Sequence, residues 1–435
     1  MLKSKIKCFV LLLLVLMFIN TLSACKTRET QKTSSDTAYS GGAQTVSSEV
    51  QNYTTDQNTE KADYVSSNEI VIIDCEDIPE DSDVFVQEGP NRYFDDVRFV
   101  DIGEKACILP KIIKKGSEGN FKYAIHENGK VQILKYIGNE SHVIIPDNLL
   151  GYPVSYIGNL AFAENNPIEY DDKAKCMLKS VVIPDTVVSI ADEAFYGCRG
   201  LESIKLSNRL KCIGSLAFAS CENISVLKLP RELEAIGYCT FKNIGIKQLV
   251  IPPTIRYIGS GAFSDCFKLK ELKFEGGSIY IDGGIINNSA LESICIPANL
   301  NIQGDGGMFC SENLIDVEYA ETMNEATIVY AEMYRSCSKL QEVKLPNNIT
   351  KIEEYAFQGC TSIKEIHIPK SVKQIDTWAF TQCYSLRNIY FESADCDGLD
   401  EAGFAGQIRF IHAPSGGSIE KYCLEHPLLN FVPID

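Results

Sequence analysis

A phrase of about 23 residues recurs along most of this chain, and its period constrains the fold more than any other feature of the sequence. Most copies open with an aliphatic residue and proline, whereas Ser207, Glu275 and Ala320 occupy the proline position in the others. Two further aliphatic residues, an Ala-Phe pair and often a cysteine follow at fixed intervals. It closes with Leu-x-x-Ile-x-Ile, and prolines open copies at Pro184, Pro230, Pro252, Pro297, Pro346 and Pro369. Because one short coil cannot bury its apolar residues alone, the period indicates a stacked solenoid.

The period and the Leu-x-x-Ile-x-Ile segment predict an α/β-type leucine-rich repeat solenoid of about eleven coils, each of 22–23 residues. Alternation in that segment places the second and third apolar residues inward and the residues before and between them outward. Stacked coils then form a parallel sheet on one side. We expect the Ala-Phe pair on the opposite return, where phenylalanine fills the core.

The repeat also resembles a known family. Leu-x-x-Ile-x-Ile-Pro followed by Ile-x-x-x-Ala-Phe-x-x-Cys is similar to the BspA-like leucine-rich repeats of bacterial surface proteins, over about residues 121–435. Tyr123–Tyr136 resembles the hairpin that precedes the first repeat, and Gly416–Cys423 resembles the short helix that closes the last. The resemblance implies a binding or adhesion surface of diverse specificity.

The N-terminus carries an export signal. Residues 1–24 begin with lysines, continue with the apolar run Phe9–Ile19 and end in small residues, which is the order of a secretory signal peptide. Leu-Ser-Ala-Cys25 also resembles the bacterial lipobox, in which the cysteine is acylated and becomes the mature N-terminus. We therefore expect lipid attachment at Cys25 and display on the outer face of a bacterial membrane. Cleavage near Ala24 with free secretion is the alternative.

Two segments separate this signal from the repeats. Residues 25–67 are rich in Ser, Thr, Gln and Asn, so they predict a flexible polar tether that follows the lipid anchor. Residues 68–120 do not match the repeat, although Glu69–Asp74 and Val97–Val100 have the β-branched composition of short strands. We expect a small, loosely ordered cap there, with an extension of the tether as the alternative. Residues 121–435 are then the solenoid with its terminal caps.

The charge restricts the partners. The chain has 41 Lys and Arg against 58 Asp and Glu, a formal net charge of −17. Such a surface repels phosphate backbones and anionic lipid headgroups, which argues against nucleic acid and against membrane contact other than through the lipid anchor. An extracellular protein or polysaccharide is the expected partner.

The outward strand positions define a candidate binding face, because solenoids present extended sheet surfaces to their partners. The alternative is a solvated sheet laced with weak ion pairs between neighbouring strands. His367 and Tyr390 favour the C-terminal end of the face, since tyrosine combines apolar area with a polar tip. The candidate residues are Lys205, Lys228, Glu271, Lys273, Glu318, Glu342, Lys344, Glu365, His367 and Tyr390.

Six of the 17 cysteines occupy one position of the repeat. We expect them to form a ladder of buried thiols that act as small apolar residues, with a few disulfides between coils as the alternative. No Cys-x-x-Cys occurs, so we expect no metal site. The six are Cys198, Cys221, Cys266, Cys337, Cys360 and Cys383.

The repeat is irregular in places. Glycine and asparagine replace apolar residues in Glu275–Asn288 and in Gly304–Gly307, so we expect these coils to be thinner on the return side and more mobile. The copy from Ala320 to Pro346 is longer than its neighbours. Insertions of this kind often lie on the binding face, although simple decay of the repeat explains them equally well.

The sequence contains no motif typical of catalysis. The five histidines do not form His-Glu-x-x-His, and neither a nucleophile elbow nor a phosphate-binding glycine loop occurs. We therefore expect no enzymatic activity and no cofactor. The sequence favours a surface lipoprotein that binds a protein or glycan, and the alternative is a structural or accessory scaffold of an envelope assembly without an external ligand.

Overall fold

The computed structural model describes residues 71–74, 99–101, 105–163, 178–276, 278–297, 299–303, 309–319, 327–400, 402–404 and 408–434. The chain divides into two units, Met1–Ala62 and Asp63–Asp435, and every described residue belongs to the second. The predicted signal peptide, the lipid attachment at Cys25 and the tether lie outside the described residues. Among those residues, no helix combines the length and apolarity that a membrane crossing requires.

Residues 68–120 contain the strands β1 (Val71–Asp74), β2 (Phe99–Asp101) and β3 (Lys105–Ile108). They form an antiparallel sheet with β3 in the centre. Strands β1 and β2 overlap the two segments whose β-branched composition predicts strands.

An antiparallel meander opens the solenoid. Its strands are β4 (Ile112–Glu118), β5 (Phe121–His126) and β6 (Val131–Tyr136), and β6 then pairs in parallel with β9 of the first coil. The hairpin β5–β6 spans the segment predicted as the entry hairpin. Lys135 closes this end, because its Nζ donates to the carbonyls of Leu160 and Ala163 at 2.9 and 3.2 Å.

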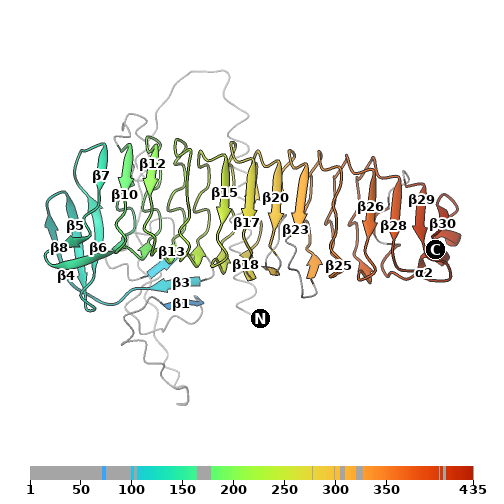
Figure 1. The fold of residues 1–435 in the computed structure, drawn as a ribbon, viewed down its shortest axis with the longest axis horizontal. Helices are drawn as coiled ribbons and strands as arrows, with labels where there is room; N and C mark the ends of the chain where they lie inside the picture. The colour runs from blue at the N-terminus through green and yellow to red at the C-terminus, as the bar shows by residue number, and fades with distance from the viewer. Residues whose placement is uncertain are drawn as a thin grey trace, which may run out of the picture. The chain divides into compact units, whose positions relative to one another are not determined.

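The Leu-x-x-Ile-x-Ile segments form the parallel sheet predicted for one side, which we call the front sheet (Figure 1). Its strands fall into three hydrogen-bonded groups, separated near residues 225–229 and 341–345. They are β7 (His142–Ile144), β10 (Ser180–Val182), β12 (Ser203–Lys205), β15 (Gln248–Ile251), β17 (Glu271–Phe274), β20 (Ser293–Ile296), β23 (Asp316–Tyr319), β26 (Glu365–Ile368), β28 (Asn388–Phe391), β29 (Phe410–Ala413) and β30 (Asn430–Pro433).

A second parallel sheet, which the sequence analysis does not predict, forms from the aliphatic residues that follow each proline slot. We call it the back sheet. Four of its strands are two residues long with both residues buried, so no polar alternation marks them. They are β9 (Tyr152–Ile157) with β8 (Asn148–Leu149), β11 (Ser189–Ile190), β13 (Cys212–Ile213), β14 (Ala235–Ile236), β16 (Tyr257–Ile258), β18 (Ser278–Asp282), β21 (Asn299–Gln303), β24 (Thr327–Val329), β25 (Ile349–Ile352) and β27 (Gln374–Ile375).

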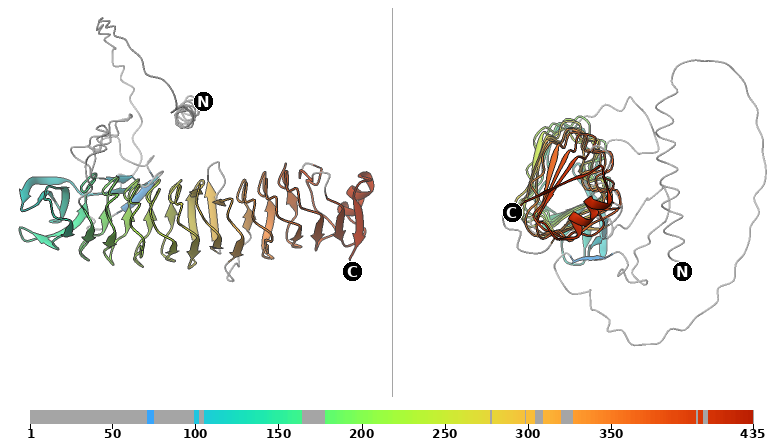
Figure 2. Two further views of the ribbon diagram at one scale, coloured as in Figure 1. Left: turned by 90° about the horizontal axis from the view of Figure 1, so that it is seen from above. Right: turned by 90° about the vertical axis from the view of Figure 1, so that its right-hand side faces the viewer.

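These elements confirm the solenoid, with about twelve coils against the predicted eleven. Seen down its axis, successive coils superpose as one closed outline (Figure 2). The coils return through turns, and α2 (Ser418–Glu425) is the single α-helix among the described residues. It lies where the closing helix is predicted, and its buried Ile419 and Cys423 seal the last coil.

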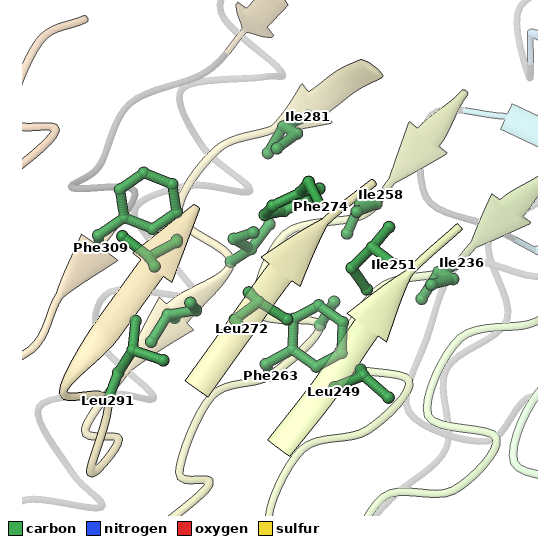
Figure 3. Close-up of a cluster of buried hydrophobic side chains, with 14 of the residues drawn as sticks. Ile236, Leu249, Ile251, Ile258, Phe263, Leu272, Phe274, Ile281, Leu291 and Phe309 are labelled. Carbon is green, nitrogen blue, oxygen red and sulfur yellow. The ribbon is translucent and has the colours of Figure 1, made fainter. Parts of the chain in front are cut away.

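A column of aromatic rings runs through the core from coil to coil. Neighbouring rings in the stacked pairs have centroids 4.8–5.8 Å apart, within the range that favours aromatic pairs. Aliphatic side chains of both sheets surround these rings (Figure 3). The column consists of Phe162, Phe195, Phe218, Phe241 and Phe263, and then of Phe309, Tyr334, Phe357, Phe380 and Phe404.

One coil interrupts the column, and there the sequence expectation is wrong in part. Ile286 pairs with Phe309 in the strands β19 (Ile286–Asn287) and β22 (Phe309–Cys310), so it occupies the phenylalanine position. Ile285 and Ile286 are fully buried. This coil is therefore filled with aliphatic residues and is not thin on the return side. Gly304–Gly307 and most of the insertion after Ala320 lie outside the described residues.

Backbone hydrogen bonds join the return of each coil, which is the segment with the Ala-Phe pair, to the return of the next coil. The N–H groups of Leu216, Phe218 and Ser220 donate to carbonyls one coil further on, at 2.8–2.9 Å. Leu216 and Ser220 adopt positive φ angles of 58° and 61°, which direct their N–H groups toward the next coil. Such left-handed residues cost about 1–2 kcal/mol each, and the hydrogen bonds between coils offset that cost.

The six repeat cysteines form the predicted thiol ladder. All six are fully buried. Each Sγ donates to the backbone carbonyl of the aromatic residue in the preceding coil, at 3.1–3.3 Å. The thiol therefore does more than fill space, because it satisfies a carbonyl that faces the core.

We expect the ladder thiols to resist alkylation in the native protein. Burial raises the pKa of Cys266, Cys337 and Cys383 to about 12, and the thiolate is the reactive form. Iodoacetamide should label them only after denaturation, whereas the half-buried Cys295 should react first and serve as the internal control, read by peptide mass spectrometry. Replacing Cys360 with Ala should lower the free energy of unfolding by roughly 1 kcal/mol. Rapid labelling of the ladder in the native state would contradict its burial.

Candidate binding face

The solvent side of the front sheet, which we call the front face, has the predicted alternation. On β17, Glu271 and Lys273 are exposed, whereas Leu272 and Phe274 are buried. The same order recurs on β15 and β26. The backbone therefore points every second side chain of this sheet toward solvent.

Parallel pairing aligns these side chains into two columns along the solenoid. Glu271 pairs with Ser293, which pairs with Asp316, while Lys273 pairs with Cys295, which pairs with Glu318. In this part of the sheet the register has no shift between strands, so chemically different residues of successive coils become direct neighbours.

The structure places each predicted site residue on the front face. Tyr390 is half-buried and the others are exposed. Lys205 lies on β12, Lys228 in segment 225–229, Glu271 and Lys273 on β17, Glu318 on β23, Glu342 and Lys344 in segment 341–345, Glu365 and His367 on β26, and Tyr390 on β28.

In the part of the chain that the structure describes, no ion pair joins one strand of this face to the next. Among the described residues, Glu342 and Lys344 come within 3.8 Å of each other on one segment. Ion pairs between coils lie just outside the face instead, such as Lys179–Glu202 and Lys270–Glu292, both at 2.7 Å. The charges of the front face are therefore largely available to a partner.

At the C-terminal end, three rings form what we call the front ladder: His367, Tyr390 and His412. The His367 and Tyr390 rings stack with centroids 4.5 Å apart, and the Tyr390 and His412 rings at 4.2 Å. The planes are within 16° of parallel. Their edges carry one hydroxyl and four ring nitrogens, so the ladder offers hydrogen-bonding groups on a rigid apolar body.

His412 and Phe410 extend the face beyond the residues that sequence reasoning selected. Phe410 is 40% exposed and contacts His412 with centroids 6.4 Å apart. The signal was present, since Phe410-Ile411-His412-Ala413-Pro414 matches the strand pattern with alanine in the last apolar position. The substitution of that one aliphatic residue hides the repeat.

The protonation of His412 depends on its packing. Burial lowers the pKa of its imidazole below the usual 6.5, while Glu365 acts in the opposite direction and His367 lowers the pKa further. Its Nε2 lies 3.5 Å from Asn388 Oδ1. The ladder therefore favours a neutral ring at physiological pH.

The described residues contain no group of three or more His, Cys, Asp or Glu side chains that could hold a metal ion. The front face instead combines columns of charge with one aromatic segment. That arrangement suits recognition of a partner surface.

Comparison with known proteins gives a family match. A family model described as a BspA type leucine-rich repeat region, in six copies, matches residues 166–245, 234–327 and 327–434. Together these matches span more than half of the chain. A search of curated protein sequences found no significant match.

Several solved structures are similar to this chain. A leucine-rich repeat protein from Bacteroides ovatus is 23% identical, with 75% of this chain and 100% of that chain covered and a TM-score of 0.31. A leucine-rich cell surface protein from Faecalibacterium prausnitzii is also 23% identical, covering 64% and 95%, with a TM-score of 0.27. The pneumococcal vaccine antigen PcpA is 15% identical, covering 75% and 100%, with a TM-score of 0.35.

Removing the central ring should alter the titration of His412. In Tyr390→Ala the imidazole becomes more hydrated, so we expect its pKa to rise toward 6.5, measured by NMR. Because the folded pKa lies below 6.5, the ladder's contribution to stability is complete above about pH 6.5 and declines as the pH falls below it. An unchanged pKa in the variant would show that Tyr390 does not shield His412.

Proposed function

Because this chain belongs to the BspA type leucine-rich repeat family, we propose that it is an exported surface protein whose front face binds a protein or glycan partner. The family match supports a repeat surface used for interaction. The signal peptide predicted in residues 1–24 supports export, and the polar residues 25–67 would hold the solenoid away from the membrane.

The observation that carries this proposal is the front ladder with Phe410. At this end of the front face three rings and a 40% exposed phenylalanine lie together, whereas the rest of the face mixes charged and polar residues with single exposed aliphatic residues such as Val226. Aromatic residues dominate the energetics of protein interfaces because they bury a large area at low conformational cost. Apolar area kept on the surface of an acidic protein is typical of a contact site.

Rigidity supports the same role. Tyr390 is fixed between two imidazoles, and each ring sits on a strand paired in register with its neighbours. A partner therefore meets a preformed surface and pays little ordering entropy. A flexible loop would bind the same partner more weakly.

We further propose that Cys25 carries the lipid anchor. The lipobox-like Leu-Ser-Ala-Cys25 directly follows the apolar run, and acyl chains bind membranes at about 0.8 kcal/mol for each buried methylene. The anchor would hold the protein at the membrane without any binding of lipid headgroups by the acidic solenoid.

Partner binding is tested with arrays of extracellular matrix proteins and polysaccharides. We expect Tyr390→Ala to weaken binding of the recovered partner by at least about tenfold, as truncation of an aromatic anchor does. The matched control is Tyr384→Ala, which removes a 59% exposed tyrosine outside the front ladder. Equal loss in both variants would refute the site. Recovery of a single stoichiometric envelope component, without any array signal, would favour a scaffold instead.

Anchoring is tested by fractionation of the expressing bacterium. Cys25→Ala should move the protein from the membrane fraction to the medium or the soluble fraction, because no acyl chain then holds it. The control Cys295→Ala removes a cysteine from the front face and should leave the protein in the membrane. Membrane retention of the Cys25 variant would disprove lipid attachment.

A further inference from the structure

A cleft of ≈ 560 Å³ opens on the front face far from the front ladder. It lies where the front sheet is interrupted between β12 and β15, and Figure 1 shows no strand arrow there. Its lining comes from residues 225–229 and from 247–250, with Arg231, Pro252 and Glu275 at the sides. Volumes of this size are typical of small-molecule and cofactor sites.

The backbone of residues 225–229 is free within this cleft. Their N–H and C=O groups make no hydrogen bond with any other residue that the structure describes. The coils on both sides remain stacked, since Phe195 N–H donates to Ala217 and Phe218 N–H to Thr240 at 2.8 and 2.9 Å. The unpaired groups therefore face a gap that return-side hydrogen bonds hold open, and they are available to a ligand.

The charge of the cleft is opposite to that of the protein. Three cations line it, Lys228, Arg231 and Lys247, against the single carboxylate of Glu275. In the described part of the chain, none of the three cations has an ion-pair partner. The chain carries a net charge of −17, so this is a local site of positive potential that concentrates anions.

An apolar floor separates the cations. Val226 is 77% exposed and Val250 is 45% exposed, and both line the cleft beside the amide of Gln248. A ligand that fits must combine an anionic group with hydroxyls or amides and with a compact apolar side. An acidic sugar has all three, because its carboxylate, its hydroxyls and the C–H face of its ring lie on one rigid frame.

We propose that this cleft binds the carboxylate-bearing unit of an acidic saccharide, with Arg231 and Lys228 holding the carboxylate. A guanidinium suits this role because its planar fork matches a carboxylate with two parallel hydrogen bonds. The inference deepens the proposed function, since it names a ligand class for the front face and rests on that face being a binding surface.

An acidic peptide fits the cleft less well. Peptides that bind sheets usually add a strand at a free edge. Here residues 225–229 already occupy the place between β12 and β15 in the stack of coils, so a peptide cannot insert there as a further strand. A peptide would therefore bring carboxylates without the full ladder of backbone hydrogen bonds that strand addition supplies.

The test is calorimetric titration of the mature protein with digalacturonate at low salt. We expect saturable binding that weakens as salt rises, and no binding of the neutral disaccharide galactobiose. Arg231→Gln and Lys228→Gln should each weaken binding by about tenfold or more. The matched control Arg209→Gln removes an exposed cation of the neighbouring coil that does not line the cleft, and it should leave the affinity within about twofold.

Each other outcome overturns the proposal. Equal binding of galactobiose would show that the charge of the ligand plays no role. Equal loss of affinity in Arg209→Gln would indicate only diffuse electrostatic attraction. Binding of tetraglutamate in preference to digalacturonate would make the ligand a peptide, and no binding of either would leave the cleft without this function. Tyr390→Ala should not change digalacturonate binding, so failure here leaves the partner site at the front ladder standing.

Discussion

Register between coils is the constraint on which the rest of this structure depends. Hydrogen bonds join each return to the next, and they set one phenylalanine ring on another at 4.8–5.8 Å. Once Phe195 lies on Phe218, the thiol of Cys221 meets the carbonyl of Phe195, and the strands of both sheets align. A slip of one residue would turn the front-face charges inward, so the apolar core and the surface columns are specified together.

Much of this fold could be predicted from sequence, because burial on one side leaves a periodic signal. Glu271 and Lys273 alternate with Leu272 and Phe274, and the structure places them as that alternation predicts. The back sheet leaves no such signal, since both residues of Cys212–Ile213 are buried and short apolar pairs do not distinguish a strand from a turn. The left-handed corners were equally hidden, because Leu216 has no preference for positive φ and adopts it only through hydrogen bonds between coils.

For the candidate sites, too, the position of a residue on its strand could be predicted from sequence, whereas contacts between coils could not. His367 and Tyr390 could be assigned to the front face from their strand positions alone. The stacking with His412 depends on pairing between strands 22 residues or more apart in sequence, and alanine at position 413 hid that strand. The cleft near Lys228 arises where residues 225–229 form no backbone hydrogen bonds with the neighbouring strands. Their sequence follows the ordinary repeat pattern, so it does not predict this interruption of the sheet.

Export, as proposed above, would give the thiol ladder a further consequence. While the coils are closed, each ladder sulfur faces a carbonyl and stays apart from oxidants. Opening a few coils in an oxidising medium would expose several thiols at once on one chain, and a disulfide formed between two of them before the coils close would not be reversed by restacking. Such a disulfide would hold neighbouring coils in the wrong register, so each opening of the coils could make the unfolding irreversible. The lifetime of the molecule in such a medium would therefore depend on how rarely its coils open, which is a kinetic property and not an equilibrium one.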